Sequence, residues 1–350
     1  MPSWWTFYMH RRQFLNLSAV TATAPLLSSC GGAPEEFPVS IKSGFADSDF
    51  TSKSTAEDVT KGLDLSGKTM LITGCNSGIG FETMRVLALR GAHVIGTGRT
   101  IEKASAACAN VVGKTTPLAM ELTSFESVLD CENQVQALGI PLDALICNAG
   151  ISGRKQKQVV NGIEIAFLVN YLSHFLFLHK LLPVVTAAEQ GRIVHVGSRA
   201  GYTRTPPEGI RFNTLGESNG GFEYDSWEYY GQSKLANALF SRKLAQKLAG
   251  TTTTSNALHP GFVKTSIARG QGRLTELAFD IAGPLIAKNI EEGAATTCYA
   301  ASYPELAKAS GEFLFDSNVV TVGGTHHMED NALADRLWTV SEQMLGSYLS

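Results

Sequence analysis

A tyrosine and a lysine four residues apart, Tyr230 and Lys234, are well suited to acid–base chemistry in this 350-residue chain. On a helix this spacing places the phenol and the ammonium on one face. A phenol has an unperturbed pKa of about 10, and a positive charge beside it favours the phenolate and lowers that pKa. The pair alone is weak evidence, since roughly half a match is expected by chance in such a composition.

A glycine-rich segment, residues 73–80 (TGCNSGIG), lies where the first expected strand passes into a helix. A dinucleotide diphosphate needs close backbone approach and free N–H groups at a positive helix end, which glycines permit. We expect Gly74 to make the tight turn, Gly78 to admit the phosphates and Gly80 to let the helix pack on the strand. The segment predicts cofactor contacts from Gly74, Asn76, Ser77, Gly78, Ile79 and Gly80.

The second expected strand and the residues that follow it form the segment HVIGTGRT, residues 93–100. This segment contains no acidic residue and ends in Arg99 and Thr100. Enzymes that prefer NAD usually place Asp or Glu here to bind the ribose 2′-hydroxyl, whereas a guanidinium suits a 2′-phosphate. We therefore predict NADP(H) as the preferred cofactor, with NAD(H) as the alternative. A solvated surface arginine with no role in binding is the competing interpretation of Arg99.

From Leu63 onward, short apolar runs alternate with helix-period segments, which is typical of βαβ units around a parallel sheet. We expect one doubly wound α/β domain of the Rossmann type over residues 63–350. Its strands are expected to begin at Met70, His93, Pro117, Leu142, Arg192, Ser255 and Glu312, which makes a sheet of roughly seven strands. Helices are expected at 78–90 and 230–249, closed by Gly91 and Gly250. Residues 266–290 have helical spacing and either cover a pocket or pack in the core.

The order of the motifs is more specific than any one of them: TGxxxGIG, then residues 147–150 (CNAG), then Asn170, Ser198 and YxxxK. This ordered set resembles the short-chain dehydrogenase/reductase family over about residues 60–320. The resemblance implies a catalytic tetrad of Asn170, Ser198, Tyr230 and Lys234. Tyr230 would exchange a proton with an alcohol or carbonyl oxygen during hydride transfer, and Ser198 would orient that oxygen. Asn170 would support a water-linked proton path to Lys234.

The same resemblance implies further cofactor contacts. Besides Tyr230 and Lys234, they come from Asn148, Ala149 and Gly150 after a strand, Glu121 and Leu122 near the adenine, and Pro260, Gly261, Val263 and Thr265 beside the nicotinamide. Two positions depart from the family pattern: Cys147 stands where Asn is usual, and Glu121 where Asp is common. They put the details of cofactor contact in doubt rather than the class of protein.

Three longer strings resemble the branch that contains retinol dehydrogenases and the WW-domain-containing oxidoreductase: residues 54–68, 225–240 and 258–267. That branch implies a small lipophilic substrate, an alcohol, aldehyde or ketone of retinoid-like or steroid-like character. The segment between Ser198 and Tyr230 either lines an apolar pocket or forms a mobile surface loop; its aromatic residues are Tyr202, Phe212, Phe222, Tyr224 and Trp227. Two other functions stay open, a non-catalytic dinucleotide-binding regulator and an epimerase or dehydratase on the same fold.

The N-terminus has the features of an export signal. Arg11 and Arg12 precede a mildly apolar run, residues 14–27, that is too short to span a bilayer, and residues 27–30 (LSSC) resemble a bacterial lipobox. We expect residues 1–30 to be a twin-arginine lipoprotein signal, with Met9 as an alternative start, and residues 31–62 to be a linker. Lipidation of Cys30 would anchor the protein to a membrane of the bacterial cell envelope. The alternative is a disordered extension on a cytoplasmic protein.

Composition argues against several other classes. The chain is 44% hydrophobic and 17% charged, which is globular rather than disordered. The net charge is −3 and no run of basic residues lies beyond the leader, so the sequence does not indicate nucleic-acid binding. No cysteine pair has zinc spacing, and we expect no metal site at His326-His327. The family resemblance implies a homodimer or homotetramer that pairs through the helices bearing Asn170 and Tyr230.

Overall fold

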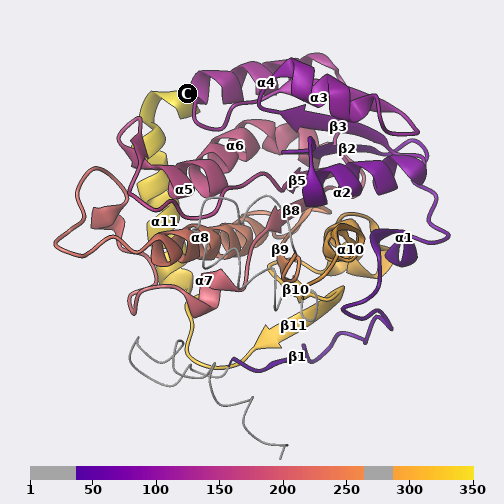
Figure 1. The fold of residues 1–350 in the computed structure, drawn as a ribbon. Helices are drawn as coiled ribbons and strands as arrows, with labels where there is room; N and C mark the ends of the chain where they lie inside the picture. Colours follow the sequence, from indigo (N-terminus) through magenta and orange to yellow (C-terminus); the bar gives the residue numbers. More distant parts are fainter. Residues whose placement is uncertain (1–36, 264–286) are drawn as a thin grey trace, which may run out of the picture. The chain divides into compact units, whose positions relative to one another are not determined.

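A single mixed sheet forms the centre of the computed structural model, which describes residues 37–263 and 287–350 (Figure 1). Within these residues, nine strands pair in the order β1-β11-β10-β9-β8-β5-β2-β3-β4. The parallel strands are β2 (Thr69–Ile72), β3 (His93–Gly98), β4 (Thr115–Ala119), β5 (Ala144–Cys147), β8 (Arg192–Val196), β9 (Thr254–His259) and β10 (Phe313–Phe315). The predicted α/β fold is confirmed, and every predicted strand is present.

The order of the parallel strands is that of a doubly wound fold. The chain runs outward from β2 through β3 to β4, and then returns to β5 on the other side of β2 before continuing through β8, β9 and β10. The direction of winding reverses between β2 and β5, which are hydrogen-bonded neighbours. Ligands of such sheets bind at the carboxyl ends of the strands at this reversal. Both cofactor-loop predictions, residues 74–80 and 148–150, follow these two strands.

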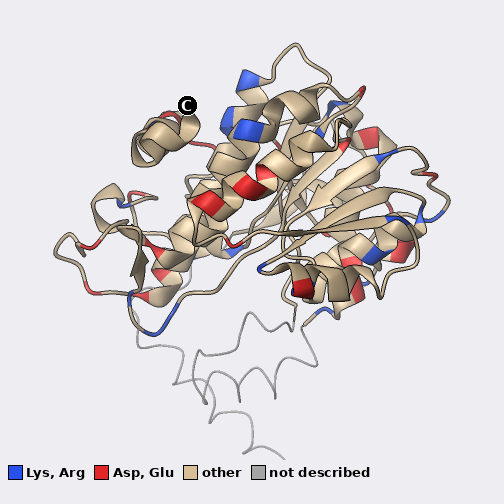
Figure 2. Ribbon diagram, turned by 90° about the horizontal axis from the view of Figure 1, so that it is seen from above, with Lys and Arg blue, Asp and Glu red and all other residues tan. Residues whose placement is uncertain are grey.

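Helices cover both faces of the sheet (Figure 1). One buried cluster lies beneath α1 (Ala56–Val59), α2 (Gly78–Leu89), α3 (Ile101–Cys108) and α10 (Ile290–Ser302). The other lies beneath α4 (Phe125–Ala137), α6 (Ser173–Thr186), α8 (Ser226–Lys247) and α11 (Asn331–Leu345). Short elements complete the described chain: the hairpin of β6 (Val159–Val160) and β7 (Ile163–Glu164), α5 (Ile165–Phe167), the π-helical turn η1 (Leu168–Leu172), α7 (Ala200–Thr203) and the 3₁₀ turns η2 (Phe212–Thr214), η4 (Pro304–Lys308) and η5 (Gly346–Leu349). Figure 2 shows acidic and basic residues dispersed over helices and loops, while the strands are mostly uncharged.

Two antiparallel strands extend the sheet beyond the predicted seven. β11 (Asn318–Val322) folds back on β10, and β1 (Val39–Ile41) pairs with β11. The turn between β10 and β11 is made by Asp316 and Ser317, both with positive φ (48° and 59°). Hairpin turns of this kind usually carry Asn-Gly or Asp-Gly. Because this turn contains no glycine, the sequence pattern did not indicate a hairpin.

The helix that carries Tyr230 begins four residues earlier than predicted. α8 starts at Ser226, and the carboxylate of Asp225 caps it by accepting from the N–H groups of Trp227 and Glu228. An Asp before a helix is a standard start signal, and here it begins the helix ahead of the apolar stripe further along. Tyr230 therefore lies in the second turn, where the backbone is fully helical.

One long helical stretch passes through the core and carries Asn170. Residues Ile165–Thr186 are apolar and long enough to cross a membrane, but most of the stretch is buried inside the domain. α11 packs against α6 and α8, where Trp338 contacts the rings of Phe175 and Phe240. The predicted pairing of two chains through α6 and α8 stays a prediction, and this C-terminal helix already covers part of that face.

The segment before β2 is part of the domain rather than the predicted linker. Phe50 packs edge-on against Tyr299 and Tyr303, and Ala56 and Val59 of α1 are fully buried. In the described residues the fold thus begins at residue 37 instead of residue 63. The expected signal at residues 1–30, with Cys30, and the helical stripe of residues 266–290 up to residue 286 lie outside the described residues.

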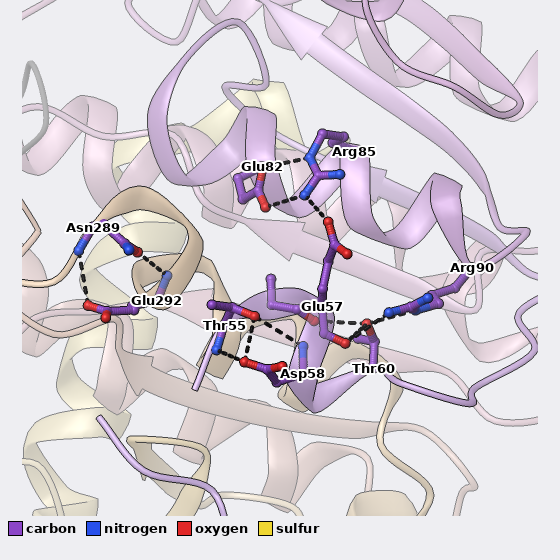
Figure 3. Close-up of polar contacts among 10 residues, drawn as sticks. Thr55, Glu57, Asp58, Thr60, Glu82, Arg85, Arg90, Asn289 and Glu292 are labelled. Carbon is purple, nitrogen blue, oxygen red and sulfur yellow. Dashed lines mark hydrogen bonds and ion pairs between the residues drawn. The ribbon is translucent and has the colours of Figure 1, made fainter. Parts of the chain in front are cut away.

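Polar contacts hold this segment on α2, as Figure 3 shows. The carboxylate of Asp58 accepts from the N–H of Thr55, while the Thr55 hydroxyl accepts from the N–H of Asp58. Arg85 of α2 pairs with Glu57 of α1 at 2.6 Å, and Arg90 donates to the carbonyl of Glu57 at 2.8 Å. These contacts fix the capped turn of α1 against the helix that follows the glycine loop.

We expect Val59→Ala to lower the free energy of unfolding by about 1–2 kcal/mol, since it empties a buried site. Val39→Ala is the matched control, because Val39 is 38% exposed and loses little packing. Urea unfolding of both variants measures the difference. If Val59→Ala were as stable as the wild type, residues 37–62 would be a linker after all.

Candidate active site

Tyr230 and Lys234 lie one turn apart on α8, both buried, with the lysine Nζ 5.8 Å from the centre of the tyrosine ring. The ammonium donates a hydrogen bond to the backbone carbonyl of Val196, at the end of β8, at 2.9 Å. Ser198 lies two residues after the end of β8, and its hydroxyl is close enough to the phenol to lower the pKa of Tyr230. The structure thus brings three of the four predicted catalytic side chains together at the carboxyl end of β8.

Burial has the largest effect on the pKa values of Tyr230 and Lys234. It raises the pKa of Tyr230, and the Ser198 hydrogen bond only partly opposes it. Burial also lowers the pKa of Lys234 from 10.5 to about 8, because one backbone carbonyl takes the place of the water around its ammonium. Without the cofactor, burial thus outweighs any lowering of the Tyr230 pKa by Lys234, while the lowering predicted from Lys234 together with the oxidised nicotinamide stays a prediction. The phenol is neutral at physiological pH.

Asn170 holds a backbone loop. It lies in the π-helical turn η1, and its Oδ1 accepts from the N–H of Ile151 at 2.8 Å. Its Nδ2 donates to the carbonyl of Ile151 at 3.0 Å and to the hydroxyl of Ser233 at 2.9 Å. These bonds tie the loop after β5 to α8 beside Lys234. The Asn170 side-chain amide is hydrogen-bonded to Ser233. The water-linked path from Asn170 to Lys234 stays a prediction.

The glycine loop fits a dinucleotide diphosphate. Gly74 has φ of +72°, and a Cβ there would lie 2.9 Å from the Cβ of Ala149. A Cβ on Gly80 would lie 2.2 Å from the carbonyl oxygen of Gly74, so only glycine lets α2 pack this closely. Ser77 begins α2 without a side-chain cap, and the first turn carries no acid. The uncapped N–H groups and the helix dipole therefore favour an anion at this point, where Asn76, Ser77 and parts of Gly78 and Ile79 reach the surface.

A threonine that the sequence reasoning gave no role connects the two cofactor loops. The hydroxyl of Thr73 accepts from the N–H groups of Asn148 and Ala149 at 3.0 and 2.9 Å. The Asn148 amide in turn donates to the carbonyl of Thr73 at 2.8 Å. A Cβ on Gly150 would lie 3.0 Å from Oδ1 of Asn170 and 3.5 Å from Nζ of Lys234. The loop 148–150 therefore lies between the glycine loop and the side chains of Asn170 and Lys234.

The residues expected near the adenosine differ in whether they already make hydrogen bonds within the protein. Arg99 is exposed and makes no hydrogen bond with any other described residue. The Thr100 hydroxyl caps α3 by accepting from the N–H of Lys103 at 3.4 Å. The Glu121 carboxylate accepts from the N–H and hydroxyl of Thr123, both at 3.0 Å, and the buried Leu122 accepts through its carbonyl from Ser173. Glu121 and Leu122 thus shape the turn after β4.

The predicted loop beside the nicotinamide follows β9. Pro260 is buried, Gly261 has φ of +89°, and Val263 pairs with Lys288 in a short parallel bridge. Thr265 lies outside the described residues. The positive φ favours glycine at position 261, where a Cβ would lie 2.6 Å from the Lys288 side chain.

The aromatic side chains between Ser198 and Tyr230 do not lie together on one surface. Trp227 is 37% exposed and meets the Tyr230 ring edge-on, with centroids 6.1 Å apart. Tyr202 is buried against Phe313 in the core, whereas Phe222 is 43% exposed beneath the Arg211 guanidinium. Trp227 therefore lies beside Tyr230 whereas Tyr202 lies in the core, and the apolar pocket stays a prediction.

The chain is similar to characterised families over most of its length. A family model described as short chain dehydrogenase matches residues 68–209. The chain is 38% identical to short-chain dehydrogenase TIC 32 A, chloroplastic, of Brassica napus, over 86% of this chain and 95% of that protein. It is 34% identical to retinol dehydrogenase 12 of Mus musculus, over 82% and 89%. An uncharacterised protein of known structure from Mycobacterium paratuberculosis aligns with TM-score 0.65 at 30% identity, covering 82% of this chain and 96% of that one.

We expect Lys234→Met to stabilise the cofactor-free protein at pH 7 by on the order of 3 kcal/mol, the cost of keeping a proton on a lysine whose pKa is lowered from 10.5 to about 8. Below pH 8 both the folded and unfolded wild type carry this proton, so the cost is constant. Between pH 8 and 10.5 the folded state loses the proton first, and wild-type stability rises with pH.

Urea unfolding from pH 7 to pH 10.5 measures this effect as the difference between the wild type and Lys234→Met, which should shrink toward high pH. Lys61→Met is the control, because Lys61 is exposed and its replacement should leave the pH dependence unchanged. A difference that stayed constant with pH would show that the buried ammonium carries no such cost.

Proposed function

This chain belongs to the short-chain dehydrogenase/reductase family, and on that premise we propose that it reduces a lipophilic aldehyde or ketone with NADPH and oxidises the alcohol in the reverse direction. The resemblance to the branch of retinol dehydrogenases and the WW-domain-containing oxidoreductase is confirmed by the curated relatives. The chain is thus an oxidoreductase. Its substrate, its cofactor preference and the role of Tyr230 are the parts that we propose.

The observation that carries the proposal is a buried, neutral phenol beside a serine hydroxyl and a lysine ammonium. Burial raises the pKa of Tyr230, so at neutral pH this side chain is a proton donor. The Ser198 hydroxyl is its neighbour and can hydrogen-bond the same substrate oxygen. A carbonyl placed between them is held by two donors, which polarises it toward reduction.

When bound, the nicotinamide supplies the hydride for the carbonyl carbon. Tyr230 gives its proton to the carbonyl oxygen, and Ser198 orients that oxygen through a hydrogen bond. The Lys234 ammonium lies 5.8 Å from the tyrosine ring centre and stabilises the phenolate that proton transfer leaves behind. In the oxidation direction the same groups act in reverse, and Tyr230 takes the proton of the alcohol.

A lipophilic substrate is supported by one exposed aromatic side chain beside the catalytic tyrosine and another in the loop predicted to lie beside the nicotinamide. Trp227 lies one turn before Tyr230 and is 37% exposed, and Phe262 in the loop after β9 is 45% exposed. Large exposed aromatic side chains at a site are typical of apolar ligand binding. The name of retinol dehydrogenase 12, a relative, denotes a lipophilic alcohol.

NADP(H) is supported by the end of β3. Arg99 follows this strand directly, is exposed and has no partner among the described residues. No acidic side chain stands at this point of the chain to bind a ribose 2′-hydroxyl. The free guanidinium is therefore available to a 2′-phosphate, which it can bind with two parallel hydrogen bonds.

We expect Tyr230→Phe to lower turnover by about 10²–10⁴, the usual contribution of a general acid, without abolishing NADPH binding. Loss of nicotinamide absorbance with a panel of lipophilic aldehydes and ketones measures turnover, and nicotinamide fluorescence measures binding. Tyr229→Phe is the matched control, since Tyr229 is the adjacent buried tyrosine of α8 and the variant deletes the same hydroxyl group. NADPH binding with no wild-type turnover on any carbonyl would favour a non-catalytic regulator.

Removing the Arg99 guanidinium should raise the KM for NADP(H) by about tenfold or more while changing the KM for NAD(H) little, because one charged hydrogen-bonding partner of the phosphate is lost. Steady-state kinetics of Arg99→Ala with both cofactors tests this. Lys114→Ala removes an exposed positive charge from the opposite end of the neighbouring strand and serves as control. An unchanged cofactor preference in Arg99→Ala would remove this residue from the site.

A further inference from the structure

A buried histidine on α6 joins the end of β2 to the turn that carries Asn170. His174 lies one turn after Asn170 and is 1% exposed. Its Nε2 lies 2.9 Å from the hydroxyl of Thr73, and its Nδ1 lies 3.3 Å from the backbone carbonyl of Asn170. The ring therefore connects the end of β2 with the turn that carries Asn170.

The hydrogen bonds of Thr73 determine the tautomer of this ring. A hydroxyl has one hydrogen to donate and two lone pairs to accept with. The N–H groups of Asn148 and Ala149 both donate to the Thr73 oxygen and occupy these lone pairs. The hydroxyl hydrogen must then go to Nε2 of His174. The ring proton is consequently on Nδ1, which donates to the carbonyl of Asn170.

The His174 ring stays neutral at physiological pH. Burial, and to a smaller extent the charge of Lys234, lowers the pKa of His174 to about 4. A second ring proton, on Nε2, would point at a hydroxyl oxygen that already accepts two hydrogen bonds. Geometry and burial therefore favour the same uncharged form, and His174 acts as one acceptor and one donor.

The two partners of His174 hold the same loop at its two ends. Thr73 bonds the N–H groups of Asn148 and Ala149, and Asn170 bonds both backbone groups of Ile151. Between these points the loop passes Lys234, since a Cβ on the intervening glycine would lie 3.5 Å from its Nζ. A shift of this loop would thus change the cofactor site and the surroundings of the catalytic lysine together.

We propose that His174 is a positioning residue that sets the loop of residues 148–151, and through it the cofactor site, by linking Thr73 to Asn170. The proposal rests on the proposed function, because this loop is part of the predicted NADP(H) site. It adds a residue that touches neither substrate nor cofactor and acts through hydrogen bonds alone. The first test of this role needs neither substrate nor cofactor.

The first test is amide hydrogen exchange of the cofactor-free protein, followed by mass spectrometry of a peptide covering residues 148–151. We expect His174→Leu to speed exchange there, because Thr73 loses the acceptor that orients its hydroxyl. His195→Leu is the matched control: His195 on β8 is also 1% exposed, and it hydrogen-bonds Ser255 instead. Equal exchange of this peptide in the two variants would overturn the proposal.

Two polar variants separate the contacts and decide the matter even if His174→Leu does not fold. His174→Gln can place an acceptor near the Nε2 position for Thr73, whereas His174→Asn can place a donor only near the Nδ1 position. We expect His174→Gln to keep the exchange protection and the NADPH affinity of the wild type. We expect His174→Asn to bind NADPH about tenfold more weakly, the effect of one lost buried hydrogen bond.

The same behaviour of His174→Gln and His174→Asn in both measurements would contradict the proposal, since a general packing role predicts no difference between them. The proposed function fails separately. A wild type that binds NADPH but reduces no carbonyl would overturn the reaction, while the exchange comparison would still decide the role of His174.

Discussion

The hydroxyl of Thr73 is the contact on which the arrangement of the site depends. It sits at the reversal point of the sheet and accepts hydrogen bonds from the loop that follows the neighbouring strand. The glycine loop starts at the next residue, so the position of Gly74 and the start of α2 are set relative to residues 148–150. The phosphate end of the cofactor site and its catalytic end are therefore positioned by one side chain.

The catalytic helices bring polar groups into the interior, where they need partners. Asn170, Ser233 and Lys234 are each at most 4% exposed, and each is hydrogen-bonded within the described structure. The lysine is the least well compensated, because a neutral carbonyl faces its charge. A buried cation of this kind costs stability, and it is retained where chemistry requires it. The same burial raises the pKa of Tyr230, so its phenol keeps its proton at neutral pH.

The N-terminal segment and the antiparallel strands complete the domain away from the chemistry. β1 and β11 add to the side of the sheet that would otherwise end at β10, while α1 packs on α10 and α2. The Glu57–Arg85 pair ties this segment to the helix that begins at the glycine loop. These additions enlarge the sheet and move its edge from β10 to β1, a strand of only three residues.

The sequence by itself determined the fold class, the glycine loop and the pairing of Tyr230 with Lys234. Each of these follows from local spacing: alternating strand and helix periods, glycines at a strand end, and two side chains one helical turn apart. The place of Ser198 beside this pair was implied by the family resemblance and not by spacing. Only the tertiary structure decided that residues 37–62 are folded, that Asn170 holds Ile151 and Ser233, and that His174 belongs to the site. Protonation was also decided there, because burial by distant segments raised the pKa of Tyr230 against the effect expected from the lysine. The physical reason is the same in every case, since hydrogen bonds and burial between residues such as Thr73 and His174, 101 positions apart, leave no trace in local spacing.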